Sequence, residues 1–310
     1  MALHIGVDIG GTNLRIGVVD GQRLIHESRT EADFSGLCKS HPPAIAWQKI
    51  IQTSSKALLA VLDAFPGVVA VGIGFPGFID PNSQRIAQSP NLPGLQNVDL
   101  AADLAPLIGR PVVVENDALA AAYGEFRLHP EDCQNLIYIG LGTGVGGGLI
   151  LNGQPYPGQH GVAMEVGHII VRAGGRVCGC GNLGCLEQYA SASGVQITYS
   201  ELTGKHLSAA EIAGMAEQGD IHALAAYQAA GAALAQVLAS ILKVVDVEHV
   251  VIGGGMSQAW ALMQPTFDAR LDTELIPVLR GRIRVSISSS GDHAGMIGAA
   301  LLAAESQRVS

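Results

Sequence analysis

The sequence predicts an α/β protein that consists of two related halves. Apolar segments typical of strands alternate with segments of helical spacing along the 310 residues, a pattern that indicates layered α/β structure. The segments HIGVDIGGTNLRIGVVD and LIYIGLGTGVGGGLILN share one form, in which a Gly-Thr turn joins two apolar runs. We therefore expect one domain of residues 1–118, completed by a helix at about 293–310, and a second domain of residues 119–292.

Each element follows from a local pattern. Both Gly-Thr segments predict strand–turn–strand hairpins, because the turn residues interrupt apolar runs of strand length. The other expected elements are, in chain order, a helix from about Pro43 to Phe65, a buried strand in VVAVGIGFPG, a short strand PVVVEN that ends at Asn116, an alanine-rich helix from about Asp220 to Val245, a strand in VEHVVIGGGM and a final helix in HAGMIGAALLAAES.

Composition limits the possible partners. Hydrophobic residues make up 48% of the chain and charged residues 15%, which is typical of a globular protein with a large core. The net charge of -9 argues against nucleic acid or an anionic membrane as partner, because both bind basic surfaces. The opening segment MALHIGVDIG has no basic leader, and Asp8 interrupts its apolar run. We therefore expect a cytoplasmic protein without a signal peptide or transmembrane helix, and small-molecule ligands.

Three glycine-rich loops each follow a predicted strand: Gly10-Gly11-Thr12-Asn13, Gly142-Thr143-Gly144 and Gly253-Gly254-Gly255. Glycine lets the backbone approach a polyanion and direct its N–H groups at phosphate oxygens, and threonine adds a hydroxyl donor. None of the loops has the GKS or GKT of a P-loop, and GTGVGGG lacks the helix of a dinucleotide fingerprint. A single loop of this kind is also typical of an ordinary tight turn, so it is their number that favours phosphate binding.

The first two loops resemble the paired phosphate loops of the actin-like sugar kinase fold, in which hairpins from two domains hold the nucleotide phosphates. Asp8 stands where that fold has a carboxylate near a magnesium ion. A turn-capping role for Asp8 is the alternative, and its place inside an apolar strand disfavours it, because an unpaired charge there is costly. The resemblance implies that ATP and Mg2+ contact Asp8, Gly10, Gly11, Thr12, Asn13, Thr143, Gly144, Gly254 and Gly255.

The segment PVVVENDALAAAYGE places Asn116 and Asp117 where a buried strand meets a helix. Ligands of open α/β folds bind at the carboxyl ends of such strands. Asp117 could also simply cap the helix, since Asp is common at that position. Phosphoryl transfer to a sugar hydroxyl needs a carboxylate that accepts the hydroxyl proton, and we predict Asp117 as that base. Glu115 points to the other face of the strand, and we expect a structural role for it.

His168, Cys178, Cys180 and Cys185 form the pattern H-x9-C-x-C-x4-C. Four such ligands without an open position are typical of a closed tetrahedral Zn2+ site, which is structural rather than hydrolytic. A redox centre fits less well, because C-x-C is not the C-x-x-C of thioredoxin-like proteins. Three buried cysteines without a metal are a further alternative, although the intervening glycines offer little apolar surface for them to pack against.

The combination of DIGGTNLR, END, GTGVGGG, EVGH, CGCGNLGCLEQYAS and VVIGGG closely resembles the ROK family (repressors, open reading frames and kinases), and within it the bacterial glucokinases. The resemblance implies the actin-like ATPase (ribonuclease H-like) fold, with two α/β domains and a cleft between them, and a homodimer. It also implies residue roles. His168 and the three cysteines would hold a structural zinc ion, Asp117 would be the catalytic base, and the sugar would contact Gly77, Asn91, Asn116, Asp117, Glu165, His168 and Glu187.

Two positions depart from the family pattern. Members often have Gly where Met164 stands, and bacterial glucokinases often have Trp where this chain has Leu95.

We therefore expect an ATP-dependent kinase of a hexose, with glucose phosphorylated at its 6-hydroxyl to glucose 6-phosphate. N-acetylglucosamine, N-acetylmannosamine or fructose are alternative substrates. A sugar-sensing repressor of the same family is less favoured, because the DNA-binding helix-turn-helix of those proteins precedes the first phosphate loop, whereas Asp8 follows only seven residues in this sequence.

Overall fold

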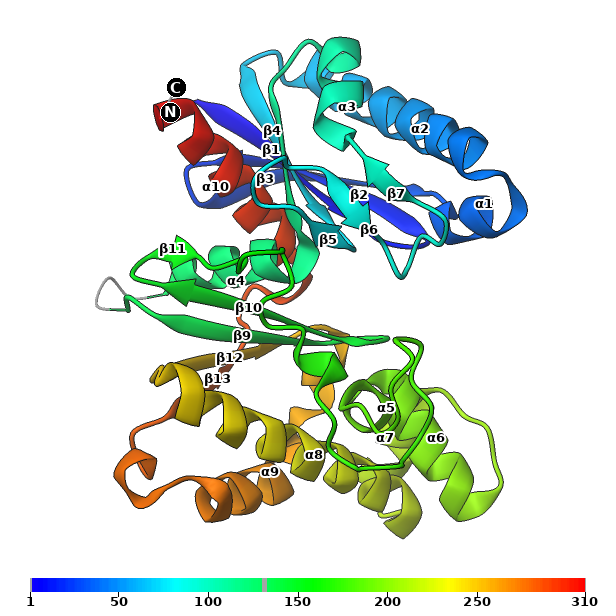
Figure 1. The fold of residues 1–310 in the computed structure, drawn as a ribbon, viewed down its shortest axis with the longest axis vertical. Coiled ribbons are helices and arrows are strands. Elements are labelled where there is room, and N and C mark those ends of the chain that lie inside the picture. Colours follow the sequence, from blue (N-terminus) through cyan, green and yellow to red (C-terminus); the bar gives the residue numbers. More distant parts are fainter. Residues whose placement is uncertain (1, 130–132, 310) are drawn as a thin grey trace. The chain divides into compact units, whose positions relative to one another are not determined.

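The computed structural model describes residues 2–129 and 133–309, and the chain divides into two units (Figure 1). Unit 1 comprises Met1–Gln134, Gly148–Ala163 and His293–Ser310, and unit 2 comprises Asn135–Gly147 and Met164–Asp292. Unit 1 includes the whole helix that begins at Asp117, because this helix packs along the last helix of the chain, whereas the sequence predicted a domain boundary after residue 118. The boundary between independently folding domains stays a prediction.

A five-stranded sheet with the order β3-β2-β1-β4-β8 forms the centre of unit 1. The predicted first hairpin is confirmed, with β1 antiparallel to β2, while β4 and β8 continue the sheet in parallel from β1. A smaller sheet has the order β5-β6-β7. The strands are β1 (Leu3–Ile9), β2 (Asn13–Asp20), β3 (Arg23–Glu31), β4 (Val68–Phe75), β5 (Phe78–Ile79), β6 (Ile86–Gln88), β7 (Gln96–Val98) and β8 (Val112–Asn116).

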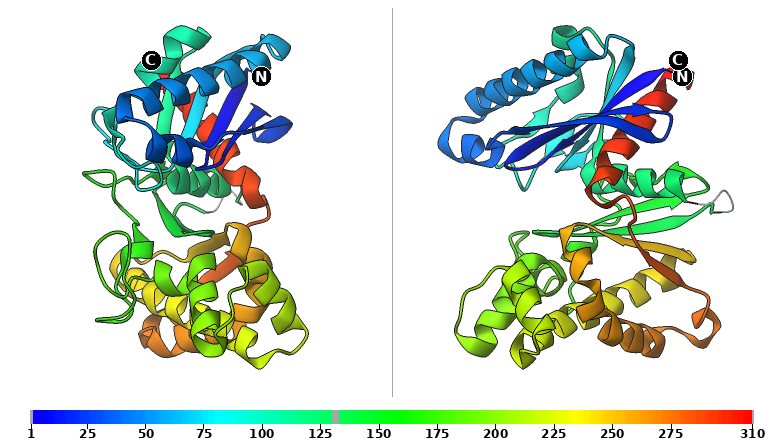
Figure 2. Two further views of the ribbon diagram at one scale, coloured as in Figure 1. Left: turned by 90° about the vertical axis from the view of Figure 1, so that its right-hand side faces the viewer. Right: turned by 180° about the vertical axis from the view of Figure 1, so that it is seen from behind.

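Helices cover both faces of the larger sheet (Figures 1 and 2). Ile5, Val7 and Ile9 point to one face, and they share a hydrophobic cluster with residues of α2 and α3. On the other face α10 lies directly on glycines, since a side chain at Gly6 or Gly72 would collide with its backbone carbonyls. The helices of unit 1 are α1 (Phe34–Ser40), α2 (Pro43–Ala64), α3 (Leu100–Ile108), α4 (Asp117–Leu128) and α10 (Ala294–Val309).

The second five-stranded sheet has the order β11-β10-β9-β12-β13. Counted along the chain, its strands follow the same order as those of the first sheet, as expected of related halves. β12 is parallel to both β9 and β13. The strands are β9 (Leu136–Leu141), β10 (Val145–Leu151), β11 (Gln154–Pro155), β12 (His249–Gly253) and β13 (Arg284–Ile287).

A helical layer completes unit 2, with α8 in contact with α5, α6, α7 and α9. The helices are α5 (Glu187–Ala190), α6 (Ala192–Thr203), α7 (Ala209–Glu217), α8 (Ile221–Val245) and α9 (Trp260–Glu274). Short 3-10 turns are η1 (Val166–His168), η2 (Gly255–Ala259), η3 (Pro277–Leu279) and η4 (Gly291–His293).

Helix α8 is the one described helix that is long and apolar enough to cross a membrane by length and composition. It has 25 residues, and half of its most apolar window is buried inside the protein. The same length and apolarity are found in core helices, and α8 packs against four other helices. Its length and composition are therefore weak evidence for a membrane span.

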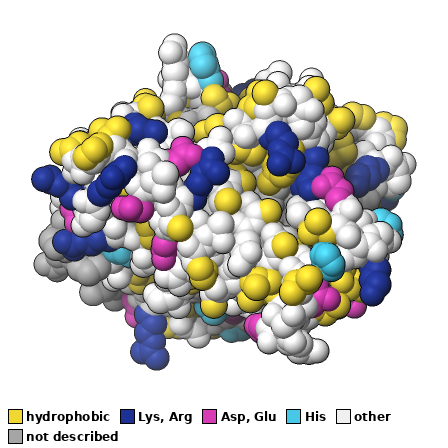
Figure 3. All heavy atoms as spheres, turned by 90° about the horizontal axis from the view of Figure 1, so that it is seen from below, with side chains coloured by type: hydrophobic (Ala, Val, Ile, Leu, Met, Phe, Trp, Pro, Cys, Tyr) yellow, Lys and Arg dark blue, Asp and Glu magenta, His cyan; other side chains and the backbone are white. Residues whose placement is uncertain are grey.

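The face of the molecule shown in Figure 3 carries acidic and basic side chains interspersed with each other and with scattered apolar groups. Such mixing leaves no broad area of a single charge on that face.

Candidate functional site

Most of the predicted ligand-binding residues of unit 1 lie at the carboxyl ends of three parallel strands, β1, β4 and β8. Strand register places Asp8 of β1 opposite Gly74 of β4, and Phe75 of β4 opposite Asn116 of β8. The first glycine loop follows β1, and Gly77 and Asp117 follow β4 and β8. The structure thus brings these residues to one edge of the sheet, which is the usual ligand-binding edge of open α/β sheets.

The first glycine loop closes the hairpin through its own backbone. The Gly10 N–H donates to the Asn13 carbonyl over 2.8 Å, and the Thr12 hydroxyl accepts from the Asn13 side-chain amide over 2.9 Å. Arg29 of β3 donates to the Asn13 Oδ1. Neither Gly10 nor Gly11 has a positive φ, and an added Cβ would meet no atom closer than 3.4 Å. The fold itself therefore leaves room beside both glycines, as a bound phosphate group requires.

Asn116, rather than Asp117, caps helix α4. Its side-chain oxygen accepts from the Leu119 N–H over 3.0 Å, and its amide nitrogen donates to the Gly77 carbonyl over 3.1 Å. Asp117 occupies the first helical position, where its Oδ1 accepts from the Ala118 N–H over 2.8 Å. The helix cap therefore does not depend on the Asp117 carboxylate, and the capping alternative applies to its neighbour.

Gly77 is required by its surroundings, since a Cβ there would lie 2.7 Å from the Gln88 carbonyl oxygen. The following turn contains Asn91, which is exposed, and the hydroxyl of buried Ser89 organises it by accepting from the Leu92 N–H. Leu95 is 1% exposed and belongs to the hydrophobic core of unit 1. The departure at this position therefore places an apolar side chain in the core.

Glu115 lies next to Asn116 and accepts from that residue's backbone N–H over 2.8 Å. Removal from water raises the pKa of its carboxyl to about 7, although this hydrogen bond favours the charged form. A carboxyl with such a pKa gains or loses its proton near neutral pH.

In unit 2, the other two glycine loops leave neighbouring parallel strands. Gly253 at the end of β12 pairs with Gly140 of β9. A Cβ at Gly254, where φ is +80°, would lie 2.3 Å from the Leu141 carbonyl oxygen, so the third loop packs against the end of β9, from which the second loop leaves. At Gly142 and Gly255, by contrast, φ is not positive and an added Cβ would meet no described atom within 4 Å. Their surroundings do not require glycine, and they leave the space that a phosphate group needs.

His168, Cys178, Cys180 and Cys185 converge as the sequence predicted, with their ligand atoms all within 4.8 Å of one another. The Cys178 Sγ lies 3.7 Å from the His168 Nδ1, and the Cys180 Sγ lies 3.6 Å from the Cys185 Sγ. Tetrahedral zinc with sulfur at about 2.3 Å and nitrogen at about 2.0 Å requires ligand atoms about 3.5 to 3.8 Å apart. The residues therefore fit a Cys3His metal centre.

The loop that carries the cysteines is a small hairpin. Val177 and Leu183 form a bridge across it, and the Cys178 N–H donates to the Asn182 carbonyl over 2.9 Å. Gly181 and Gly184 have φ of 94° and 83°, values that favour glycine. Cys178 and Cys185 are buried and Cys180 is exposed.

The two predicted sugar-binding glutamates of unit 2 lie close to this centre and to the second glycine loop. The Glu165 Oε2 is 3.8 Å from the His168 Nε2, and the Glu187 Oε2 accepts from the Val145 N–H over 3.1 Å. Burial raises the pKa of Glu165, and the nearby charge of Glu187 raises it further, while His168 lowers it. The carboxylates of Glu165 and Glu187 and the imidazole of His168 therefore lie near the second glycine loop.

Met164, just before Glu165, has a φ of 65°. Glycine adopts this left-handed conformation without strain, whereas methionine does not. The departure at this position therefore places a side chain where the backbone conformation favours glycine.

Two features of unit 2 were not found by sequence reasoning. The Val145 N–H is a backbone donor and has no sequence signature. Arg176 stands two residues before Cys178, and its contacts become evident only in the folded chain.

Known proteins resemble the chain over nearly its whole length. The ROK family model matches residues 4–306. An N-acetyl-D-glucosamine kinase of Salmonella paratyphi B is 34% identical, with 97% of this chain and 99% of that protein covered. A ROK family glucokinase from Streptomyces griseus, solved with glucose and AMPPNP, is 32% identical, with a TM-score of 0.80 and coverage of 98% and 99%. A ROK hexokinase from Thermus thermophilus is 28% identical, with a TM-score of 0.81 and coverage of 99% and 100%.

These relatives confirm the expected actin-like ATPase fold and the expected class of enzyme. ATP and Mg2+ are the cofactors that such kinases imply. The chain belongs to the ROK family and is an ATP-dependent sugar kinase.

Proposed function

We propose that the protein phosphorylates the 6-hydroxyl of a hexose and that Asp117 accepts the hydroxyl proton. This proposal rests on the start of α4, where the Asn116 side chain caps the helix. The Asp117 carboxylate is not the cap and is therefore available for a catalytic role. A carboxylate at the carboxyl end of a parallel strand is well placed to act as a general base on a bound hydroxyl.

The proposed sugar ligands of unit 1 are Gly77, Asn91, Asn116 and Asp117, and those proposed within unit 2 are Glu165, His168 and Glu187. Carboxylates and amides accept from and donate to sugar hydroxyls, and a wrong epimer leaves one of these groups without its partner. The hydrogen bond between Asn116 and the Gly77 carbonyl supports a shared role for these two residues.

Nucleotide binding is assigned to the three glycine loops, with Asp8 toward the magnesium ion. The supporting observation is the space beside Gly10, Gly11, Gly142 and Gly255, where side chains would meet little or nothing of the chain itself. When bound, Mg2+ offsets charge on the transferring phosphoryl group. Thr12, Asn13, Thr143, Gly144 and Gly254 complete the predicted contacts.

We assign zinc to the Cys3His centre, in a structural role. Four ligands close the coordination shell, so no position is left for a reacting water molecule. Its proposed effect is to fix the hairpin next to Glu165 and Glu187. A homodimer and a cytoplasmic location stay predictions.

Two hexoses are favoured among the candidate substrates. Glucose is favoured by the resemblance of NLPG and CLEQYAS to bacterial glucokinases and by the similarity to the Streptomyces griseus glucokinase. N-acetyl-D-glucosamine is favoured by the 34% identity to the Salmonella kinase.

The experiment is a coupled assay with ATP and Mg2+ against glucose, N-acetylglucosamine, N-acetylmannosamine, mannose and fructose. The highest kcat/KM identifies the substrate, and Asp117→Ala should abolish that turnover. Full turnover by Asp117→Ala would show that another group is the base.

A further inference from the structure

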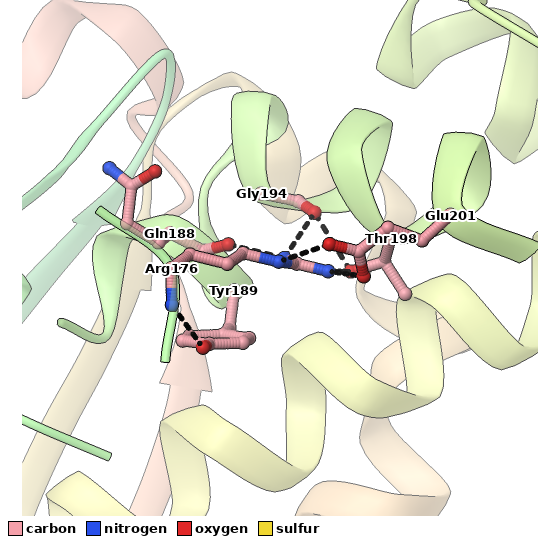
Figure 4. Close-up of polar contacts among 6 residues, drawn as sticks. All are labelled: Arg176, Gln188, Tyr189, Gly194, Thr198 and Glu201. Atoms are coloured by element: carbon pink, nitrogen blue, oxygen red, sulfur yellow. Dashed lines mark hydrogen bonds and ion pairs between the residues drawn. The ribbon is translucent and has the colours of Figure 1, made fainter. Parts of the chain in front are cut away.

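Every N–H group of the Arg176 guanidinium donates a hydrogen bond (Figure 4). Its Nη1 donates to the backbone carbonyls of Gln188 and Gly194. Its Nη2 donates to the Thr198 hydroxyl over 3.0 Å and to Glu201 over 2.6 Å, and its Nε donates to the other oxygen of Glu201 over 3.1 Å. A planar fork that is fully occupied in this way fixes the relative positions of the groups it joins.

The ring of Tyr189 holds the same side chain from one face. The Arg176 guanidinium carbon lies 4.6 Å from the ring centroid, and the Arg176 backbone N–H donates to the Tyr189 hydroxyl over 3.0 Å. The Arg176 side chain is 14% exposed, whereas the Glu201 side chain is 57% exposed. The Glu201 end of the ion pair is therefore much more exposed to solvent than the Arg176 end.

The network joins three segments of unit 2. Arg176 belongs to the metal-binding hairpin, Gln188 and Tyr189 belong to α5, and Thr198 and Glu201 belong to α6. Residue Glu187 begins α5, directly before the Gln188 carbonyl that Arg176 binds. The hydrogen bond from the Arg176 guanidinium to the Gln188 carbonyl therefore also fixes the backbone of the preceding residue, Glu187.

The same turn also reaches the second glycine loop. Glu187 accepts from the Val145 N–H, the Ala192 N–H donates to the Gly142 carbonyl over 2.9 Å, and the Ser193 hydroxyl donates to the Thr143 carbonyl over 3.2 Å. A shift of α5 and of the start of α6 would therefore move Glu187 relative to this loop.

We propose that Arg176 is a positioning residue for the sugar site. It holds the start of α5 against the metal-binding hairpin, and so fixes the Glu187 carboxylate in the orientation that binds a sugar hydroxyl. The proposal rests on the proposed function, because it takes Glu187 as a sugar ligand.

The experiment compares Arg176→Met and Arg176→Lys in the full-length protein, with metal content, melting temperature and the KM for the best hexose measured on each. Arg172→Met is the matched control, because Arg172 lies on the same hairpin and its guanidinium also lies over Tyr189, at 5.5 Å, while its side chain is exposed. We expect Arg176→Met to raise the sugar KM about tenfold with unchanged metal content. Lysine should restore part of the loss, and Arg172→Met should stay within about twofold of the wild type.

The decisive measurement repeats Arg176→Met in a Glu187→Gln background. If Arg176 acts through Glu187, the two effects overlap and the double variant is little worse than Glu187→Gln alone. A full tenfold effect in that background, or an unchanged sugar KM in Arg176→Met, overturns the proposal. If Arg176→Met does not fold, the same cycle with Arg176→Lys decides.

Failure of the underlying function gives a different result. Glu187→Gln alone would then leave the sugar KM unchanged, which removes Glu187 as a ligand and overturns the positioning role with it. A raised KM in Glu187→Gln together with an unchanged KM in Arg176→Met would overturn the positioning role alone.

Discussion

The Glu187 carboxylate accepts a hydrogen bond from the Val145 backbone N–H, with 3.1 Å between the Oε2 and N atoms. A proposed sugar ligand is therefore bonded directly to the backbone of a proposed phosphate loop. The two binding functions proposed for unit 2 would meet at this contact.

Replacing Gly144 with Ala tests this contact. A Cβ at Gly144 would lie 2.4 Å from the Glu187 Oε2, so the carboxylate must move away. We expect the sugar KM to rise about tenfold, since a misplaced ligand loses its hydroxyl contact. Gly142→Ala is the companion variant, because its Cβ meets no described atom, and it should raise mainly the KM for ATP. Equal effects of both variants on the sugar KM would contradict this assignment.

Asp117→Asn and Asn116→Ala should separate catalysis from stability. Loss of the base should lower kcat by about 10²- to 10⁴-fold, while the melting temperature stays close to that of the wild type because Asn116 provides the cap. Loss of the cap in Asn116→Ala should destabilise the protein by about 0.5 to 2 kcal/mol. The measurements are steady-state kinetics, thermal melting and urea unfolding. A strongly destabilised Asp117→Asn would mean that the carboxylate has a structural role.

The partly buried carboxyl of Glu115 should make stability depend on pH. Its pKa rises from 4.5 to about 7 on folding, so between these values the folded state holds a proton that the unfolded state lacks. The contribution is fully present below about pH 4.5 and is lost as the pH rises through 7.

Glu115→Gln should remove this part of the pH dependence. The free energy of unfolding is measured with urea at pH 5 and pH 8. Its decrease from pH 5 to pH 8 should be about 2 kcal/mol smaller in the variant than in the wild type. Identical differences in both proteins would show that Glu115 titrates normally.

Cys178→Ser should release the metal and lower both the melting temperature and the affinity for the sugar, because the hairpin next to Glu165 and Glu187 loses its fixed geometry. Metal analysis, thermal melting and the sugar KM check this. Cys38→Ala is the control, since Cys38 is buried in unit 1 and lies outside the cluster. A metal-free Cys178→Ser with wild-type melting and KM would refute a structural role for the metal.

Gly298→Ala should destabilise unit 1 by about 1 to 3 kcal/mol, because a Cβ there would lie 1.8 Å from the Ala120 carbonyl oxygen of α4. Gly295→Ala in the same helix adds a Cβ that meets no described atom within 4 Å. This control should be stabilised by up to about 1 kcal/mol through its better helix propensity. Chemical unfolding of both variants tests the close approach of α4 and α10.

Local patterns were sufficient to predict much of the fold. The hairpins β1–β2 and β9–β10 follow from apolar runs around glycine turns, and α2, α8 and α10 follow from helical spacing. Helix α7 was not predicted, although Ser208 and Glu211 form a capping box at its start. Its apolar pattern is short, and such segments depend on tertiary packing more than on propensity.

The site was less fully predictable. The metal ligands have a diagnostic spacing, so their convergence could be expected. The choice between Asn116 and Asp117 as the cap could not, because both residue types cap helices and only the backbone geometry distinguishes them. Arg176 bonds to backbone carbonyls and to side chains 22 and 25 positions away, and no local pattern encodes such contacts.

The packing of α10 on β1 and β4 has a consequence for synthesis on the ribosome. Carbonyls of Met296 and Ala299 lie against Gly6 and Gly72, so residues near position 300 cover a sheet whose strands end by Asn116. Until those residues leave the ribosome, the nascent sheet lacks the helix that covers β1 and β4 on one of its faces. The first strands of unit 1 are synthesised before unit 2, but unit 1 can finish folding only when synthesis of the chain is nearly complete. Its incomplete sheet is therefore exposed to chaperones throughout the synthesis of unit 2.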